Sequence, residues 1–238
     1  MASNEIQSMR MTVAQVLHEI APNDLEQIVL YLAPHVTEDC RAMAAELSKQ
    51  IPKVQILQQV QPGLWHDIQQ YLRQHSQASH FLLAASDGEM ADEAFGRLVE
   101  GSREKPAQVV KFSRFMPGGG FSSEHGPLLQ LATRVFGIIG NLLYGAHLSD
   151  FTYGVGSIPL QIFLAMYLET PSYAGVMEHN LISLRMHLPI EELPVHQVAR
   201  FESYSGNSIF AKFLYIIPLL KLRVAPQDKL FRTEDAPK

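Results

Sequence analysis

The sequence has very little cysteine, no long hydrophobic run and no basic excess. Its single cysteine, Cys40, excludes an intrachain disulfide and a cysteine-based zinc site, so we expect a reducing compartment. Because no run of about 18 apolar residues occurs, we expect no membrane-spanning helix. The 24 acidic residues outnumber the 19 lysines and arginines, and the net charge of -5 argues against a nucleic-acid partner. The start of the chain lacks the apolar core of a signal peptide, and we expect a cytoplasmic protein.

The sequence does contain the pattern of a layered α/β domain. With 47% hydrophobic and 18% charged residues, we expect a single domain over residues 1–238. Short apolar runs alternate with helical patterns in a βαβαβ succession, which predicts a mostly parallel, Rossmann-type sheet with helices on both faces. The expected strands are residues 26–33, 53–60, 79–86, 107–113 and 191–199. The later expected helices are residues 128–143, about 177–188 and an amphipathic stretch from about 208.

Two acidic residues, Asp87 and Glu89, directly follow the expected strand at 79–86. In open α/β sheets, ligands bind beyond the carboxyl ends of the strands. Side chains two residues apart on an extended segment point to the same side, so both carboxylates could hold one Mg²⁺ or Mn²⁺ ion. Such an ion would neutralise a leaving diphosphate. The alternative is structural, because these residue types also favour turns and the first turn of a helix.

Four segments of the sequence, the first of which contains these two acidic residues, occur in an order that suggests a family. They read "SDGEM" at 86–90, "VVKFSRFMPGGG" at 109–120, "ATRVFGIIGNLLYGAHLSDFTYG" at 132–154, and "ISLRMHLPIEELPVHQVARFESYSGNS" at 182–208. Over roughly residues 25 to 215 the chain resembles a family-2 glycosyltransferase of GT-A type, from the branch that includes dolichol-phosphate mannose synthases. The resemblance implies inverting, metal-dependent transfer of a sugar from a nucleotide-sugar donor to an acceptor such as a lipid phosphate or a saccharide.

The resemblance also implies roles for individual residues. Asp87 and Glu89 stand at the metal and diphosphate positions. The implied substrate-binding residues are Ser113, Arg114, Arg134 and Arg200. Arginine suits phosphate because its planar fork can bond two oxygens. A hydroxyl acceptor would need a general base, for which Asp150 and Glu178 are the candidates, whereas a lipid phosphate would need none. The structural alternatives are a surface ion pair for Arg114 and a turn cap for Asp150.

The amino-terminal part departs from this family. Its members begin with an apolar strand followed by "P-x-y-N-E" and carry "V-D-D-G-S" after the second strand, and these segments hold the nucleotide base and ribose. Here the first strand is missing or much shortened, and the corresponding second strand runs into Pro34 and His35 without an aspartate pair. The nucleotide-binding part is therefore shortened or degenerate. The alternative function is a non-catalytic, glycosyltransferase-like binding or partner protein.

The carboxy-terminal helix suggests a third interpretation. Its apolar residues are Phe210, Phe213, Leu214, Ile217 and Leu220, with Lys212 and Lys221 nearby. A helix of this kind can lie in a bilayer interface, which would place the protein at the inner face of the membrane, while the alternative is a helix packed on the core. The sugar, the base, the acceptor and the oligomeric state are left open.

Overall fold

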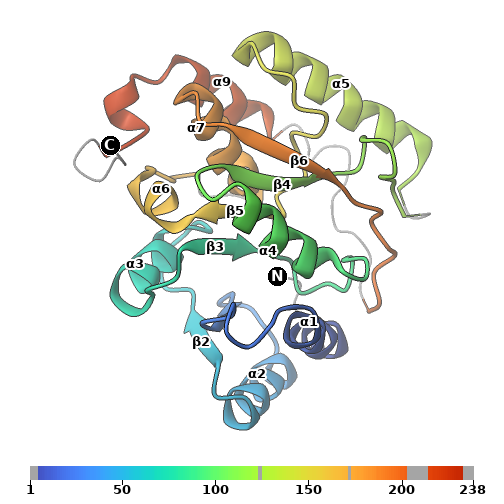
Figure 1. Cartoon of the computed structure of the whole chain (residues 1–238), viewed down its shortest axis with the longest axis vertical. Helices are drawn as coiled ribbons and strands as arrows, with labels where there is room; N and C mark the ends of the chain where they lie inside the picture. Colours follow the sequence, from blue (N-terminus) through green and yellow to red (C-terminus); the bar gives the residue numbers. More distant parts are fainter. Residues whose placement is uncertain (1–4, 123–124, 171–172, 203–213, 233–238) are drawn as a thin grey trace.

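The chain forms an alternation of helices and strands, shown in Figure 1. The computed structural model describes residues 5–122, 125–170, 173–202 and 214–232. The strands are β1 (Ile28–Leu32), β2 (Val54–Gln58), β3 (His80–Leu83), β4 (Val109–Ser113), β5 (Gly156–Pro159) and β6 (Ile190–Pro194). The α-helices are α1 (Ile6–Glu19), α2 (Glu38–Gln50), α3 (His66–His75), α4 (Ala94–Glu104), α5 (Pro127–Tyr144), α6 (Leu160–Ala165), α7 (Glu178–Arg185) and α9 (Ile216–Val224). Two short 3-10 helices are η1 (Tyr173–Met177) and η2 (Gln227–Lys229).

The described strands fall into two sheets. β1 and β2 form a parallel pair, and the other four have the order β3-β5-β4-β6. Strand β5 runs antiparallel to both of its neighbours, whereas β4 and β6 are parallel. All five expected strands are confirmed, with shorter bounds at most ends. Strand β5 was not expected, because "GSIP" is short and contains a glycine and a proline, which weaken the strand signal.

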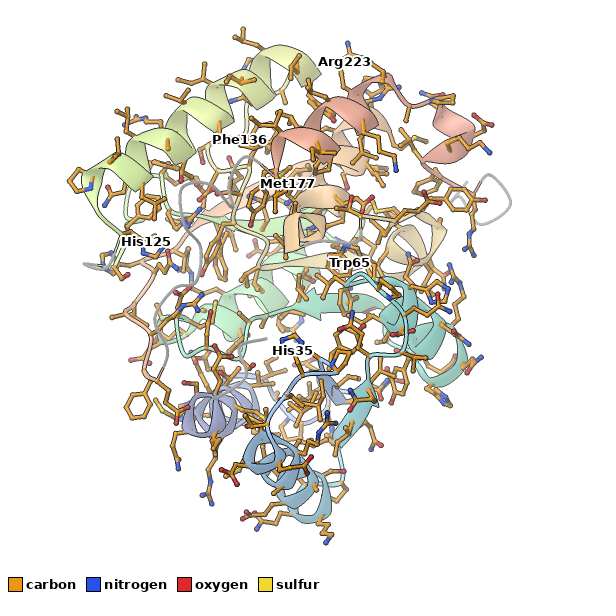
Figure 2. The ribbon with its side chains drawn as sticks, turned by 180° about the vertical axis from the view of Figure 1, so that it is seen from behind. His35, Trp65, His125, Phe136, Met177 and Arg223 are labelled. Carbon is orange, nitrogen blue, oxygen red and sulfur yellow. The ribbon has the colours of Figure 1, made fainter. Side chains whose placement is uncertain are left out.

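The core lies on both faces of the four-stranded sheet. Val109 of β4 belongs to the larger buried cluster and Val110 to a second one, and neighbouring strand residues point to opposite faces. Trp65 and Met177 mark the larger cluster in Figure 2. The indole N–H of Trp65 donates to the carbonyl oxygen of Gly175 at 2.8 Å, so this polar group is satisfied inside the core. The second cluster packs under α1 and α4, so helices cover both faces, as expected.

The helix expected at 128–143 is confirmed as α5, and its small residues face the protein. Thr133, Gly137 and Gly140 are its buried positions. The large apolar side chains are 45–79% exposed, and they are Leu128, Leu131, Val135, Ile138, Ile139 and Leu142. Glycine at 140 is required by packing, since an added Cβ would lie 2.8 Å from a ring carbon of Phe151. Ile138 and Leu142 therefore face outward, whereas Leu128, Leu131, Val135 and Ile139 line the cavity described below.

The carboxy-terminal helix α9 packs beside α5 and α7. Phe136 of α5 meets Tyr215 edge to face, with ring centroids 6.2 Å apart, and Phe136 and Arg223 are labelled in Figure 2. The amphipathic stretch expected from about 208 begins outside the described residues, as do Phe210, Lys212 and Phe213. Within the described part, no helix has both the length and the apolar character to cross a membrane.

Candidate active site

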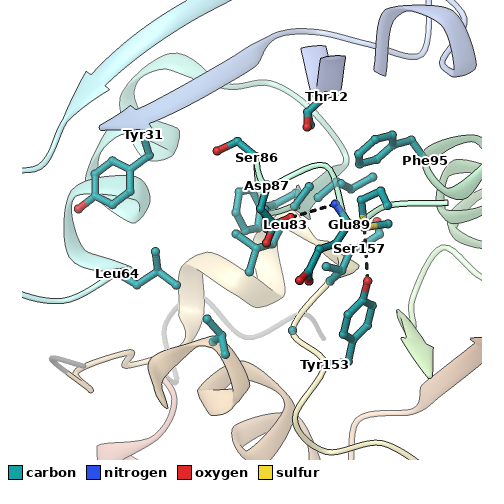
Figure 3. Close-up of a pocket in the computed structure, with 18 of the residues that line it drawn as sticks. Thr12, Tyr31, Leu64, Leu83, Ser86, Asp87, Glu89, Phe95, Tyr153 and Ser157 are labelled. Atoms are coloured by element: carbon teal, nitrogen blue, oxygen red, sulfur yellow. Dashed lines mark hydrogen bonds between the residues drawn. The ribbon is translucent and has the colours of Figure 1, made fainter. Parts of the chain in front are cut away.

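Asp87 and Glu89, here called the acidic pair, lie in a turn between β3 and α4. Gly88 has a φ of +75°, in the left-handed region that glycine adopts readily, and the backbone N–H of Glu89 donates to Asp87 Oδ1 at 3.2 Å. The expectation of an extended segment is therefore wrong at this point. The first-turn alternative is also wrong, because α4 begins at Ala94 with Glu93 in the N-cap position, whereas the expectation of a turn is confirmed. Figure 3 shows Asp87 and Glu89 side by side at the cavity.

One guanidinium joins the two carboxylates. Arg200 Nη2 lies 3.1 Å from Asp87 Oδ2, and Arg200 Nε lies 2.6 Å from Glu89 Oε1. Both acidic side chains are about nine-tenths buried. Burial and the neighbouring charge of Glu89 raise the pKa of Asp87 to about 6, although Arg200 opposes this shift. The structure thus brings together three residues that the sequence predicted for metal and phosphate binding.

A second, more deeply buried ion pair lies next to the first, and its Arg114 lines the same cavity. Arg114 binds Asp150 through two bonds, Nε to Oδ2 at 2.7 Å and Nη2 to Oδ1 at 3.0 Å. Its guanidinium also lies 4.5 Å from the ring centroid of Phe121 and 4.7 Å from that of Tyr153. Burial opposes the charge of Asp150, but Arg114 holds the pKa of this carboxyl well below its ordinary value. Asp150 is therefore the ionised partner of Arg114, and this pair is buried and not on the surface. Its Oδ1 also accepts the backbone N–H groups of Thr152 and Tyr153, so the turn-cap role is confirmed beside the ion pair.

Gln197 connects the two ion pairs, and the sequence reasoning missed it. Its amide nitrogen donates to Glu89 Oε2, and its amide oxygen accepts from Arg114 Nη1 at 3.3 Å. The available signal was its position three residues before Arg200. Lys111 was also missed, although a lysine inside the apolar run "VVKFS" was visible. Burial lowers the pKa of Lys111, whose ammonium group donates to the carbonyl oxygen of Asp150 and so supports the deeper pair.

Three predicted residues do not join this network. Ser113 Oγ lies 2.5 Å from Ser149 Oγ and accepts the backbone N–H of Phe115, so it shapes the turn after β4. Arg134 is exposed on α5, with its guanidinium 5.7 Å from the ring centroid of Phe115. Their roles in substrate binding stay predictions.

Glu178, the third residue, is buried at the start of α7. Its carboxylate accepts the backbone N–H groups of Glu169 and Thr170 at 3.1 and 3.0 Å. Burial raises the pKa of Glu178, although these hydrogen bonds oppose the shift. Val176, two residues earlier, lines the cavity, whereas Glu178 itself does not.

The cavity that contains the acidic pair is large, at about 1900 Å³. Arg114, Gln197 and Arg200 line it together with the acidic pair, and its apolar walls come from α1, β1, β3 and α5. Tyr31, Leu64 and Leu83 lie around it in Figure 3. Substrate pockets typically have mostly apolar walls and a few polar groups that converge on the ligand, as this cavity does.

The acidic pair fits part of a divalent-cation site. Among the described residues no cluster of three or more His, Cys, Asp or Glu side chains could hold a metal. Two carboxylates suit Mg²⁺ or Mn²⁺, which usually complete their shell with water and substrate phosphates. Burial, and after it repulsion from Glu89, raises the pKa of Asp87, and a cation would relieve this repulsion as Arg200 now does.

Comparisons with solved structures identify the fold. A scan against protein-family models and a search of curated proteins find no match. Among solved structures, glucosyl-3-phosphoglycerate synthase from Mycobacterium tuberculosis with uridine diphosphate matches with a TM-score of 0.67 and 14% identity, covering 94% of this chain and 78% of that one. The same enzyme with Mn²⁺, UDP-glucose and glycerol 3-phosphate gives 0.66 and 15%, with the same coverage. A further mycobacterial protein gives 0.65 and 14%, covering 95% and 72%. The chain therefore has the GT-A glycosyltransferase fold.

Proposed function

We propose that this chain is a single-domain, inverting glycosyltransferase that moves a sugar from a nucleotide-sugar donor to an acceptor with the help of Mg²⁺ or Mn²⁺. The observation that carries this is the convergence of the acidic pair and Arg200 in a large cavity. Two carboxylates and an arginine are the groups that a cation and a diphosphate require. The structural neighbours with UDP, UDP-glucose and Mn²⁺ support this proposal.

Arg200 and the acidic pair would act by exchanging partners. In the free protein the guanidinium of Arg200 forms ion pairs with both carboxylates. On donor binding, Arg200 would turn to the diphosphate, whose oxygens match its planar fork, and the two freed carboxylates would then be available to hold a cation. A bound cation would neutralise charge on the departing diphosphate. Arg200 and the acidic pair thus share the task of binding the donor's charge.

Asp150 would act through Arg114 and not as a base. A carboxyl whose pKa is held well below its ordinary value accepts protons poorly, so we assign Asp150 to positioning Arg114. For a phosphate acceptor no base is needed. For a hydroxyl acceptor Glu178 is the remaining candidate, and Glu178→Gln would then lower kcat, whereas a purely structural role would lower only stability.

Nucleotide release tests the proposed activity. The assay uses UDP-glucose and other sugar nucleotides with Mn²⁺ and an acceptor panel that includes glycerol 3-phosphate, phosphoglycerate, saccharides and lipid phosphate. We expect acceptor-dependent release that Asp87→Asn abolishes. The matched control is Asp92→Asn, an exposed acid of the same segment, which should leave the rate unchanged. Equal background release in all three proteins would count against catalysis.

The second candidate function is a non-catalytic glycosyltransferase-like binding protein. It is favoured by the missing aspartate pair after β1, where the chain continues with Ala33, Pro34 and His35. Without these acids, the site lacks the carboxylates that would bind the nucleotide base and ribose, so it cannot select a nucleotide through them. Calorimetry separates the two candidates, because metal-dependent binding of the sugar nucleotide without turnover supports the second.

We also propose that the protein is cytoplasmic and touches the membrane surface through α5 and α9. Beyond the exposed face of α5, Ile217, Leu220 and Val224 of α9 are 50–82% exposed. The two helices contain Arg134, Lys221 and Arg223 but no acid, which matches anionic headgroups. The double variant Ile138→Ser/Leu142→Ser should lose flotation with phosphatidylserine vesicles, while Ile56→Ser should not. Failure of the native protein to float would remove this contact.

A further inference from the structure

The cavity lies between the two sheets, and the space between the edges of β1 and β3 is here called the gap. Among the described strands, β1 pairs only with β2, and β3 pairs only with β5. The remaining edges of β1 and β3 both line the same cavity, which touches residues 28–31 and 79–84. In Figure 3 the space lies between Tyr31, at the β1 side, and Leu83, at the end of β3. The gap is therefore bordered by strand edges on both sides.

The backbone of β1 turns unpaired groups toward this gap. The N–H of Ile28 donates to the carbonyl oxygen of Lys53, and the carbonyl oxygen of Leu32 accepts from Gln59 on the β2 side. Backbone groups of successive strand residues point to alternate edges, so Ile28, Leu30 and Leu32 face β2. Val29 and Tyr31 then face the gap. In the described part of the chain no backbone group pairs with them there.

Strand β3 presents the matching edge. The N–H of Leu160 donates to the carbonyl oxygen of Ser79, and in the antiparallel register this places Phe81 and Leu83 opposite β5. The backbone groups of His80 and Leu82 then face the gap. Across the described residues these groups also have no backbone partner. Four residues on two facing edges thus offer donors and acceptors, which native proteins normally pair.

Glu26 joins the two strands at one end of the gap, and helices α1 and α3 contribute residues to its lining. The carboxylate of Glu26, just before β1, accepts the backbone N–H of Gln77 at 2.8 Å and that of Ala78 at 3.1 Å, just before β3. This contact places the amino ends of β1 and β3 side by side, and from there both strands run along the cavity that residues 28–31 and 79–84 line. Apolar residues of α1 and α3 line the cavity, and these helices belong to different core clusters.

We propose that this gap is the docking site for an extended strand of a separate polypeptide, about five residues long and parallel to β1 and β3. The described strands are all engaged in other ladders, so none of them can fill it. A strand there would lie about 4.8 Å from each neighbour and use all of its backbone groups. Because apolar residues of α1 and α3 line the cavity, most of its side chains would be apolar and β-branched. Its carboxyl end would lie at the edge of the sheet that carries the acidic pair.

Hydrogen exchange with a synthetic peptide tests the proposal on the intact protein. The probe is a capped nine-residue peptide with five alternating valines and isoleucines between paired lysines. In the free protein, the amides of Val29, Tyr31, His80 and Leu82 should exchange at least about tenfold faster than those of Leu30 and Phe81. Peptide should slow the fast set to the rate of the slow set. This readout does not require glycosyl transfer, so its failure is distinct from failure of the proposed function.

N-methylation of the peptide distinguishes a filled gap from simple edge pairing. A strand between two neighbours uses every N–H, so methylation at either of two consecutive central positions should weaken binding at least about tenfold, whereas on a single edge only one would matter. Three results would overturn the proposal. They are protection of the four amides without peptide, protection that rises with protein concentration alone, and peptide binding that leaves these amides unchanged.

Discussion

The buried pair between Arg114 and Asp150 gives the sharpest stability prediction. The two side chains are 7% and 0% exposed and share two hydrogen bonds, so Asp150→Asn leaves a buried guanidinium without its counter-charge. Breaking a buried pair by removing one partner costs about 3–5 kcal/mol. For a chain of this size each kcal/mol lowers Tm by roughly 2–4 °C, so we expect a fall of about 6–20 °C.

Urea and thermal unfolding of Asp150→Asn and a surface control measure this effect. The control is Asp24→Asn, because Asp24 contacts Arg103 at 2.9 Å but the two side chains are 37% and 64% exposed. Removing an exposed pair should cost at most about 1 kcal/mol. If Asp150→Asn unfolds within about 1 kcal/mol of the native protein, the pair does not have the burial and geometry described.

The pH dependence of unfolding shows whether the charge of Asp150 stabilises the protein. Burial opposes ionisation of Asp150, but Arg114 holds its folded-state pKa below the ordinary value of 3.8. The carboxylate therefore contributes stability that is present above pH 3.8 and is lost as the pH falls through the folded-state value. The gap in stability between native protein and variant should shrink only below about pH 4.

Three further predictions follow from the described contacts. Burial and the charge of Glu89 raise the pKa of Asp87 from 3.8 to about 6, so the free energy of unfolding should fall as pH rises across that window. Asp87→Asn should lack this fall, and urea unfolding at pH 7 should show it to be more stable than the native protein by about 2–3 kcal/mol. Gly140→Ala should destabilise by about 1–3 kcal/mol through its clash with the Phe151 ring, whereas Gly137→Ala, whose nearest atom is 3.9 Å away, should stabilise by about 1 kcal/mol; equal thermal shifts would contradict this. Arg200→Gln should bind Mn²⁺ alone more tightly and UDP-glucose with Mn²⁺ at least about tenfold more weakly by calorimetry, and changes of the same sign would refute the exchange of partners.

Local patterns predicted most elements of this fold but not how they meet. Periodicity placed α5 almost exactly, because large apolar residues recur at helical spacing. The same pattern could not show that Gly137 and Gly140 are buried while Leu128, Leu131 and Leu142 are exposed. Strand β5 escaped because its pairing with β3 and β4 is non-local, and tertiary contacts overrode a weak strand signal.

The candidate site was predictable in its parts and not in its pairing. Motif order identified Asp87, Glu89 and Arg200, yet the contact between Arg200 and the acidic pair joins positions more than a hundred residues apart. The bond between Arg114 and Asp150 is likewise non-local, and it changes the meaning of both residues, since each satisfies the other. The departure of residues 1–35 from the family pattern was visible in the sequence. Its physical consequence, two facing strand edges across a cavity, required the structure.

The central claim is that the acidic pair holds the cation that accompanies a nucleotide-sugar donor, while Arg200 binds the donor's diphosphate. Electron paramagnetic resonance of Mn²⁺ titrated with protein and UDP tests it most directly, because bound Mn²⁺ loses the sharp signal of the free ion. The account predicts UDP-dependent binding in the native protein and in Asp92→Asn, and none in Asp87→Asn/Glu89→Gln. Binding that survives in the double variant, or that is absent from the native protein, would contradict it.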